Sequence, residues 1–415
     1  MTTPADAADS GDVRRLADWD ADRLRSLAGE YGSPLYVQDL DRVRANYERV
    51  AAAFPDADVL YAVKANAGGS VLDALRDVGA GAECASAGEV SRALAAGFQP
   101  GEIHYTAVNP PARDLDYVLD AAPGATVVVG ARDTLDRLEE RGFDGRLALR
   151  VHPGVGAGHS DEVATGADAK FGVPHDDAPG VLAGAAERGF DVVGVHAHAG
   201  SGILDAADLD SHREVLDRIA TVARSAPVDL EFVDVGGGLG VPYRPDERPL
   251  DLGAVANAVR TALADVDADL VLEPGRYLVA DAGVLLAEVN TVKPTGGATL
   301  AGVDAGMTDL LRPALYDAHH EVRSLAPDAS DRDTERVSVV GPICESTDVL
   351  AADRSLPAPA RGDLFAVGNA GAYGVEMASN YNSRPRPAVV ALDGGGDDRL
   401  AREREPLESL TRLER

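Results

Sequence analysis

The sequence predicts an α/β protein in which a (β/α)8 barrel of the TIM type is joined to an additional β domain. Between about Val59 and Val279, short β-rich apolar runs alternate with stretches rich in Ala, Leu and Arg, a pattern typical of parallel βαβ units. Eight such runs within about 220 residues fit a closed barrel, and a doubly wound sheet is the alternative architecture. After Asp281 the strand-like runs continue without long helical stretches between them, which indicates a separate β domain.

The predicted strands follow one another in a regular order. The barrel strands are Val59–Val63, Gly81–Ala85, Ile103–Ala107, Thr126–Val129, Leu147–Val151, Val192–His196, Leu230–Val235 and Leu270–Glu273. The strands of the β domain are Gly283–Val289, Thr299–Val303, Arg336–Gly341, Asp363–Val367 and Pro387–Leu392. The predicted boundaries are 40–281 for the barrel and 282–395 for the β domain, which an N-terminal strand at 33–39 completes. The ends, 1–12 and 396–415, are expected to be mobile or solvated.

The composition excludes several classes of protein. Of the 415 residues, 45% are hydrophobic and 26% are charged, proportions that favour a globular protein over a disordered one. The 69 acidic and 39 basic residues give a formal net charge of −30, which repels nucleic acid and anionic membrane surfaces. We therefore expect neither nucleic acid nor a membrane as a partner.

The composition also predicts where the protein works. We find no apolar run of about 18 residues and no signal-peptide pattern at the N-terminus. Two cysteines, Cys84 and Cys344, cannot form a disulfide framework, which agrees with a reducing cytoplasm. An acidic composition with only three lysines resembles that of cytoplasmic proteins from salt-loving microbes, where salt screens the self-repulsion. We expect a cytoplasmic, halophilic protein.

Polar residues follow the predicted barrel strands at the end where such barrels hold their active sites. The first strand leads into Lys64 among apolar residues, where desolvation would favour a nucleophilic amine, although a solvated strand cap is the plainer interpretation. The sixth strand leads into His196 and His198, which alternation places on one face. Such a pair can ligate a metal, but the ends of the later strands supply no further histidine. We therefore predict no metal.

Glycine-rich turns follow the seventh and eighth strands. They contain Gly236–Gly238 and Gly275, positions at which the backbone can approach a phosphate closely. Two turns after these two strands form the usual phosphate site of such barrels. Glu273 precedes the second turn. A lysine, a phosphate cradle, a histidine and a buried carboxylate together indicate pyridoxal 5′-phosphate, whose pyridine nitrogen a carboxylate keeps protonated.

Five motifs occur in an order that resembles the fold-type III pyridoxal-dependent decarboxylases, and among them the diaminopimelate decarboxylase family. They are Tyr61-Ala-Val-Lys-Ala-Asn66, His196-Ala-His-Ala-Gly-Ser201, Gly236-Gly-Gly238, Glu273-Pro-Gly-Arg276 and Gly341-Pro-Ile-Cys-Glu-Ser-Thr-Asp348. The resemblance runs from about Ser33 to Arg384 and implies an alanine-racemase-like barrel followed by a β-barrel or β-sandwich. It also implies a carboxy-lyase that converts meso-2,6-diaminopimelate to L-lysine and CO2, the last step of lysine biosynthesis.

The resemblance assigns roles toward the cofactor position by position. It implies that Lys64 forms the Schiff base with pyridoxal phosphate, that His198 stacks on the cofactor ring and that Glu273 meets the pyridine nitrogen. Around the phosphate it places Ser201, Gly236, Gly237, Gly238, Gly275, Arg276 and Tyr373.

The resemblance assigns substrate-binding roles to Arg276, Arg312, Tyr316, Glu345 and Tyr373. Diaminopimelate carries an ammonium and a carboxylate at its far end, so its pocket needs one anionic and one cationic partner. Glu345 suits the ammonium, and the planar forks of Arg276 and Arg312 suit the carboxylate.

The Cys-Glu segment carries two further implications. Cys344 is implied to be catalytic, as the acid that returns a proton to the α-carbon or as a group that positions this acid, and a buried structural cysteine is the alternative. In the family this segment reaches across an interface, which implies a homodimer with composite active sites. Glu83 and His152 stand where relatives commonly have Asp and Asn.

Other functions stay open at this point. A related fold-type III decarboxylase would act on ornithine, arginine or carboxynorspermidine, and a non-catalytic carrier of pyridoxal phosphate is a remote alternative. Residues 154–172 are rich in glycine and acidic residues, and we interpret them as a lid.

Overall fold

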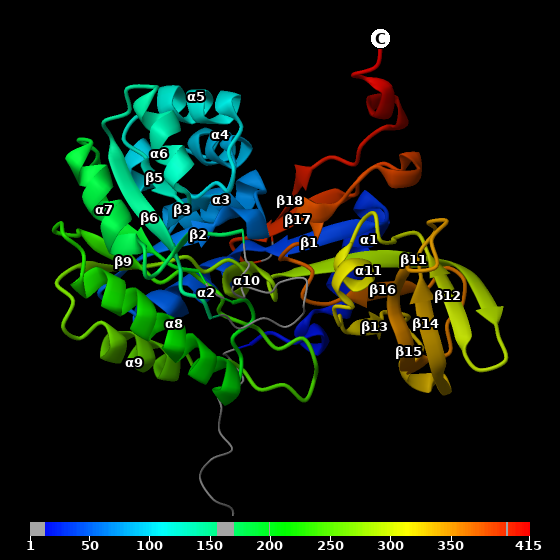
Figure 1. Ribbon diagram of the computed structural model, residues 1–415. Coiled ribbons are helices and arrows are strands. Elements are labelled where there is room, and N and C mark those ends of the chain that lie inside the picture. The colour runs from blue at the N-terminus through cyan, green and yellow to red at the C-terminus, as the bar shows by residue number, and fades with distance from the viewer. Residues whose placement is uncertain (1–12, 156–169, 199, 396) are drawn as a thin grey trace, which may run out of the picture. The chain divides into compact units, whose positions relative to one another are not determined.

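The structure is a computed structural model that describes residues 13–155, 170–198, 200–395 and 397–415. The chain divides into two compact units (Figure 1). The barrel unit comprises 44–240 and 250–277, and the β unit comprises 1–43, 241–249 and 278–415. The expectations for the end 1–12 and for most of the lid, 156–169, concern segments outside the described residues.

Among the described residues, eight parallel strands close a barrel. They are β2 (Ala57–Ala62), β3 (Gly81–Cys84), β4 (Ile103–Tyr105), β5 (Thr126–Val129), β6 (Arg146–His152), β8 (Asp191–His196), β9 (Phe232–Asp234) and β10 (Asp269–Leu272). Each strand pairs with the next, β10 pairs with β2 to complete the ring, and the short β7 (Val173–Pro174) adds to β6. The predicted barrel is confirmed, because a doubly wound sheet would leave two open edges.

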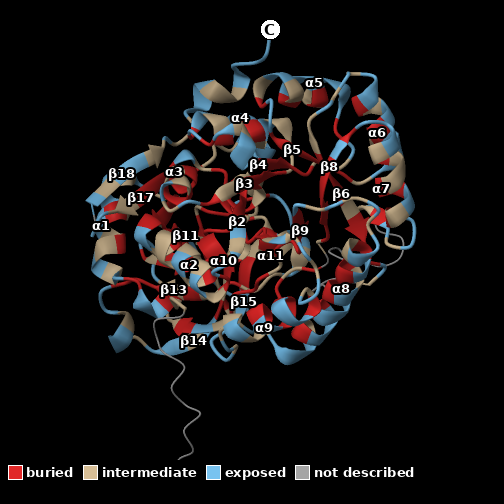
Figure 2. Ribbon diagram, turned by 90° about the vertical axis from the view of Figure 1, so that its left-hand side faces the viewer, coloured by how far each residue is buried: buried red, intermediate tan, exposed pale blue. Residues whose placement is uncertain are grey.

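Amphipathic helices cover the outside of the barrel. They are α2 (Leu40–Ala53), α3 (Gly69–Asp77), α4 (Ala87–Ala95), α5 (Ala112–Ala121), α6 (Arg132–Glu139), α7 (Ala178–Glu187), α8 (Ala206–Arg224) and α9 (Leu252–Ala262). Ser86, Asp205 and Asp251 accept backbone N–H groups at the starts of α4, α8 and α9, as N-cap residues do. Figure 2 shows the strands largely buried and the outer helix faces exposed. This burial leaves the strand ends as the place for polar chemistry.

One layer of the barrel interior is apolar. Leu60, Val128, Ala148, Val193, Phe232 and Val271, from six different strands, form one buried cluster. Gly81 and Gly194 make room for it, since a Cβ there would lie 2.1 Å from the Leu60 side chain and 2.5 Å from the Phe232 ring. Packed side chains rather than a pore fill the barrel, as is usual for this fold.

The β unit is a mixed sheet. Its strands are β1 (Leu35–Asp39), β11 (Gly283–Pro294), β12 (Thr299–Val303), β13 (Val322–Ser324), β14 (Thr334–Val340), β15 (Val349–Pro357), β16 (Leu364–Val367), β17 (Ala388–Asp393) and β18 (Asp397–Arg402). The main path is β15-β14-β12-β11-β1-β17-β18, and β16 pairs with both β11 and β13. The N-terminal β1 lies between β11 and β17. Helices α1 (Ala21–Tyr31) and α11 (Arg312–Tyr316) also belong to this unit, whereas α10 (Arg276–Val279) spans the boundary at 277/278.

The C-terminal segment differs from our expectation of a mobile or solvated end. Residues 397–402 form β18, which pairs antiparallel with β17. The strand was missed because its sequence, Asp-Asp-Arg-Leu-Ala-Arg, is mostly charged; charges are common on edge strands, where they discourage further pairing. Within the described part of the chain, no helix is long and apolar enough to cross a membrane.

Candidate active site

Lys64 lies at the carboxyl end of β2 against a buried carboxylate. It occupies a 3-10 turn, Val63–Ala65, and its Nζ is 2.5 Å from Oε2 of Glu83 on β3. The Lys64 side chain is 38% exposed, whereas that of Glu83 is 2% exposed. Burial raises the pKa of the Glu83 carboxyl, and the charge of Lys64 opposes this rise. The expected apolar surroundings of the lysine therefore contain an ionisable partner that can take a proton from it.

The register of the parallel strands brings further polar side chains together. His104 on β4 is the register partner of Glu83. On the other side of the barrel, Arg150 on β6, His196 on β8 and Asp234 on β9 are register partners in turn. Register partners in a sheet point to the same face, so these residues form a polar layer above the apolar one.

Glu273, directly after β10, is the carboxylate that we predicted for the pyridine nitrogen. It is 3% exposed, and its Oε2 lies 3.1 Å from Nε2 of His196. Burial alone would raise the pKa of the Glu273 carboxyl, but His196 and the charge of Lys64 lower it below its usual range. Its other oxygen, Oε1, has no hydrogen-bond partner among the described residues. Glu273 is thus an ionised carboxylate with one acceptor atom available.

His198 is held in one tautomer. The backbone N–H of Gly237 donates to His198 Nδ1 at 3.1 Å. Burial, with the charges of Lys64 and Arg150, lowers the pKa of His198 to about 3. The ring is therefore neutral, and Nε2 carries its hydrogen.

The glycine turns after β9 and β10 leave no room for side chains. A Cβ on Gly236 would lie 2.7 Å from the Ala197 carbonyl oxygen, and one on Gly237 would lie 2.1 Å from the Glu273 carbonyl oxygen. Gly236 also has a positive φ of 71°, which favours glycine. Backbone hydrogen bonds tie the turns together, with Glu273 N–H donating to the Gly236 carbonyl at 2.9 Å.

Three further predicted cofactor residues lie at or beside these turns. Nη2 of Arg276 is 3.2 Å from Oγ of Ser201, and Arg276 begins α10. A Cβ on Gly275 would lie 3.0 Å from the Cβ of Ala62, so this turn passes close to the end of β2. The barrel unit thus brings every predicted cofactor residue except Tyr373 to one end of its strands.

The β unit holds Arg312 in a buried polar network. The Nη1 of Arg312 donates to Nε2 of His320 at 2.8 Å, and Nδ1 of His320 donates to the Gly368 carbonyl at 2.8 Å. The guanidinium lies over the ring of Tyr243, 4.7 Å from its centroid. Arg312 is 8% exposed and His320 is fully buried. A surface ion pair, the usual role of an arginine, is therefore excluded for Arg312. Tyr316, at the end of α11, is half-buried.

The Cys344–Glu345 segment lies in a turn that Asp348 organises. Asp348 accepts the N–H groups of Ile343, at 2.6 Å, and of Met307, at 2.5 Å. Cys344 is exposed in this chain, so the alternative of a buried structural cysteine is wrong. Oε1 of Glu345 accepts from the Tyr381 hydroxyl at 2.5 Å.

Tyr373, the remaining predicted residue, is half-buried in the β unit and has a φ of 54°. A tyrosine in the left-handed region is uncommon and costs about 1 kcal/mol or more. Residues held in this way cluster at functional sites.

Comparison with known proteins identifies the family. The model of the pyridoxal-dependent decarboxylase family, pyridoxal binding domain, matches residues 40–280. The diaminopimelate decarboxylase of Methanothermobacter thermautotrophicus is 44% identical over 400 residues, which cover 93% of this chain and 92% of that protein. The chain belongs to the diaminopimelate decarboxylase family.

Two other members of the diaminopimelate decarboxylase family agree with this assignment. The protein of Pseudomonas aeruginosa is 40% identical over 397 residues, 93% of this chain and 94% of its own length. The crystal structure of the Helicobacter pylori protein complexed with L-lysine has a TM-score of 0.88 at 34% identity and covers 94% of this chain and 99% of that chain. The chain is therefore a pyridoxal-dependent decarboxylase.

The residues at the barrel mouth fit the pyridoxal phosphate of diaminopimelate decarboxylases. The glycine turns present backbone where a Cβ would collide with neighbouring turns, as a phosphate cradle requires. The available Oε1 of Glu273 can accept a hydrogen bond from a protonated ring nitrogen. Lys64 supplies an amine with a carboxylate beside it.

Sequence reasoning missed part of this diaminopimelate decarboxylase site. It did not assign roles to Glu83, Arg150, Asp234 or His320. The first three are charged residues inside predicted barrel strands. Their position could have indicated a role in the site, because charged residues seldom lie buried without a partner. His320 follows Arg312 by eight residues and gave no such signal.

Proposed function

We propose that this chain catalyses the pyridoxal-phosphate-dependent decarboxylation of meso-2,6-diaminopimelate to L-lysine and CO2. The observation that carries the proposal is the pairing of Lys64 with Glu83 and of Glu273 with His196 at the mouth of the barrel of a diaminopimelate decarboxylase. Bound pyridoxal phosphate supplies an electron sink that accepts the electron pair left on the α-carbon when CO2 departs.

The first proton transfer takes place between Lys64 and Glu83. An ammonium cannot act as a nucleophile, so Lys64 must lose a proton before its Nζ can bind the cofactor covalently. Oε2 of Glu83, 2.5 Å away, is placed to hold that proton. The buried Glu83 carboxyl, with its raised pKa, suits this exchange near neutral pH.

The residues around the pyridine ring and the phosphate hold the cofactor. Glu273 would keep the ring nitrogen protonated, and the neutral His198 would stack on the ring. The hydroxyl of Ser201, the backbone N–H groups of Gly236–Gly238 and Gly275, the guanidinium of Arg276 and Tyr373 would hold the phosphate.

The far end of the substrate meets charged groups of both signs. Arg276 and Arg312 bind the distal carboxylate and Glu345 binds the distal ammonium, with Tyr316 and Tyr373 also in contact with the substrate. A substrate without the distal carboxylate would not form these interactions with the two arginines, and we expect the site to reject it. Cys344 donates the proton that the α-carbon takes up after CO2 leaves.

We also propose a cytoplasmic homodimer that works at high salt. The exposure of Cys344 in a single chain agrees with a segment that is completed by a second subunit. The net charge of −30 supports a salt requirement, since molar salt shortens the screening length to about 3 Å.

The test is a product assay on the purified protein with added pyridoxal phosphate. Meso-diaminopimelate, ornithine and arginine are offered side by side, in dilute and in molar salt. We expect lysine from diaminopimelate alone, more of it at high salt, and none from Lys64→Ala. Turnover of ornithine or arginine would overturn the roles of Arg312 and Glu345, and cofactor binding with no turnover would favour a carrier protein.

A further inference from the structure

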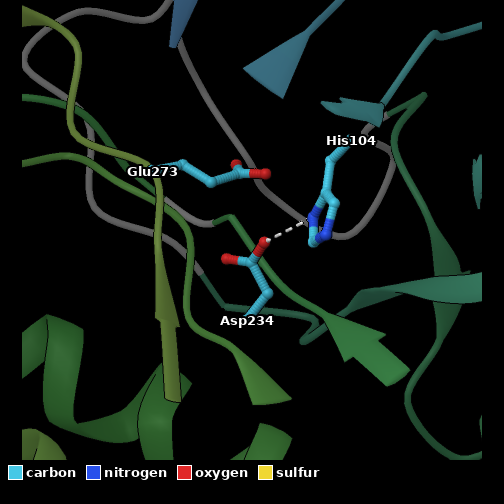
Figure 3. A group of neighbouring side chains, drawn as sticks. All are labelled: His104, Asp234 and Glu273. Carbon is cyan, nitrogen blue, oxygen red and sulfur yellow. Dashed lines mark ion pairs between the residues drawn. The ribbon is translucent and has the colours of Figure 1, made fainter. Parts of the chain in front are cut away.

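Four polar side chains lie close together inside the barrel. His196, Asp234 and Glu273 come from β8, β9 and the end of β10, which are neighbours in the ring, and His104 comes from β4. Asp234 is fully buried, and His196, Glu273 and His104 are 1%, 3% and 8% exposed. One ligand atom each of His104, Asp234 and Glu273 lies within 4.8 Å of the others. Figure 3 shows the two carboxyl groups and the imidazole turned toward a common point, with Asp234 Oδ2 3.8 Å from His104 Nδ1.

Several buried polar atoms of this cluster have no hydrogen-bond partner. Among the described residues, His104 Nδ1, His196 Nδ1, Asp234 Oδ2 and Glu273 Oε1 have no hydrogen-bond partner. Buried polar atoms are nearly always paired, and a carboxylate oxygen can only accept. One proton on a carboxyl oxygen would place a donor beside these unpartnered acceptor atoms.

The two carboxyl groups lie close enough for each to affect the ionisation of the other. Two carboxylates that share a dry site repel each other, and one of them then keeps its proton over a wide pH range. The question is which carboxyl group carries the proton.

Their partners differ. Oε2 of Glu273 lies 3.1 Å from His196 Nε2, and this contact stabilises a negative charge on Glu273. Asp234 Oδ1 accepts the N–H of Gly236 at 2.8 Å, but Oδ2 has only the 3.8 Å approach of His104. Burial and the neighbouring Glu273 raise the pKa of Asp234 well above its usual range, and burial lowers the pKa of His104. Both effects favour an Asp234 acid beside a neutral His104.

Four other charged or titratable groups lie near the cluster, on or directly after the barrel strands. They are Lys64 after β2, Glu83 on β3, Arg150 on β6 and His198 after β8. Lys64 and Arg150 are cations, and their fields act on both carboxyl groups. These two cations therefore do not change which carboxyl group keeps its proton, because it is Glu273 that contacts His196 directly.

We propose that Asp234 is a protonated carboxylic acid in the folded protein and a positioning residue that keeps Glu273 ionised. Its O–H donates to Glu273 or to His104 and pairs Oδ2, while Oδ1 retains the Gly236 N–H. This inference rests on the proposed function only where it assigns Glu273 to the pyridine nitrogen. A second ionised carboxylate would compete for the same proton, and an acid at Asp234 removes that competition.

The proton itself is tested on the protein without cofactor. Infrared difference spectra at neutral pH compare the wild type with Asp234→Asn, which keeps the Oδ1 acceptor and replaces the O–H by an N–H donor. We expect the wild type to have one additional carbonyl band of a protonated carboxyl, which shifts in D2O. Asp281→Asn is the matched control, because Asp281 is also buried but is paired with Arg42 at 2.7 Å and should contribute no such band. Absence of the band from the Asp234 difference spectrum would overturn the proposal.

The positioning role is tested by cofactor titration followed by absorbance. We expect Asp234→Asn to bind pyridoxal phosphate within about threefold of the wild-type Kd and with the same absorbance maximum, since the amide mimics the acid. Asp234→Ala, which loses the donor and the Gly236 contact, should weaken binding about tenfold or more. A tenfold loss and a shifted maximum in Asp234→Asn would mean that Asp234 acts as an anion, and the positioning role would be wrong.

The two tests separate this inference from the proposed function. A wild-type protein that failed to bind pyridoxal phosphate would overturn the proposed function, whereas the infrared spectra would still decide whether Asp234 is protonated. A wild type that binds the cofactor but lacks the band would overturn only the inference about Asp234.

Discussion

At the scale of single residues, Arg312 shows how a buried guanidinium is kept in one orientation. Its partner His320 is fixed because Nδ1 donates to the Gly368 carbonyl, so that Nε2 can only accept. The guanidinium also lies over the ring of Tyr243, 4.7 Å from its centroid. An arginine held in this way keeps its guanidinium in a fixed orientation, which bidentate binding of a carboxylate requires.

The first prediction follows from this geometry. We expect His320→Ala to raise KM for diaminopimelate about tenfold while kcat changes less, because Arg312 loses an anchor but stays in place to bind more loosely. Unfolding should also cost about 1–3 kcal/mol less, since a buried donor loses its partner. Steady-state kinetics and urea unfolding provide the two measurements.

The adjacent His319 supplies the matched control. It is only partly buried and contacts the exposed Arg244, 3.2 Å from Nη1 to Nδ1. His319→Ala should leave KM close to that of the wild type. Equal effects of the two alanine variants on KM would contradict a specific role for His320.

A second residue-scale prediction concerns pH. Burial raises the pKa of Asp309 from 3.8 to about 6, although its Oδ2 accepts the Gly306 N–H at 2.9 Å. The folded state therefore binds this proton more tightly than the unfolded state does. The stability that the proton contributes is full below about pH 4 and is lost as the pH rises through about 6.

The variant Asp309→Asn removes this dependence, because the amide keeps an acceptor and cannot ionise. Relative to the wild type, we expect its free energy of unfolding to rise by about 1–2 kcal/mol between about pH 5 and about pH 7.5. Urea unfolding of both proteins at the two pH values measures this difference. A constant difference at both pH values would show that Asp309 titrates as an ordinary carboxyl.

Much of the site could be predicted from the polar residues that follow the predicted strands. The contacts between residues of different strands could not be predicted. Lys64 and Glu273 could be placed because each follows an apolar run, at the end where barrels hold their chemistry. The contact of Lys64 with Glu83 depends on register between strands, which a single sequence does not contain. The same holds for His320, whose partner Gly368 is distant in sequence and joins it only through β16 and its neighbours.

At the scale of elements, the turns after β9 and β10 are a single packed unit. Their backbones approach so closely that the Cβ of an alanine at Gly237 would lie 2.1 Å from the Glu273 carbonyl oxygen. Backbone atoms cannot rotate away as a side chain can, so the turns must separate.

The third prediction is that Gly237→Ala weakens pyridoxal phosphate binding at least about tenfold and destabilises the fold by about 1–3 kcal/mol. Gly184→Ala in α7 is the matched control, since a Cβ there meets nothing within 4 Å. This control should stabilise the protein by up to about 1 kcal/mol, because alanine favours a helix interior. Normal cofactor affinity in Gly237→Ala would mean that these turns do not form the cradle.

Elements with strong patterns were predictable and charged or polar strands were not. The eight runs predicted for the barrel are short, apolar and separated by helical stretches, and each corresponds to an observed strand. Strands β7, β13, β15 and β18 were missed. Exposed and polar positions interrupt β15 and β18, and β7 and β13 have two and three residues, which is too short for any period to appear.

At the scale of the whole molecule, the predicted site residues are divided between two units of one chain. Lys64 and Glu273 belong to the barrel unit, and Cys344 and Glu345 belong to the β unit, where Cys344 is exposed. If the proposed homodimer has composite sites, the lysine and the cysteine of one active site come from different subunits. Whether the two residues come from different subunits can be tested without knowledge of the interface.

The last prediction is that two inactive variants complement each other. Lys64→Ala and Cys344→Ala should each lose most activity, but subunit exchange between them should produce mixed dimers with one intact site. Random exchange makes half of the dimers mixed, so about a quarter of wild-type activity should return. Differently tagged subunits show by co-purification that mixed dimers have formed. If mixed dimers form and activity stays at the level of the single variants, each site takes both residues from one chain, and the composite site is wrong.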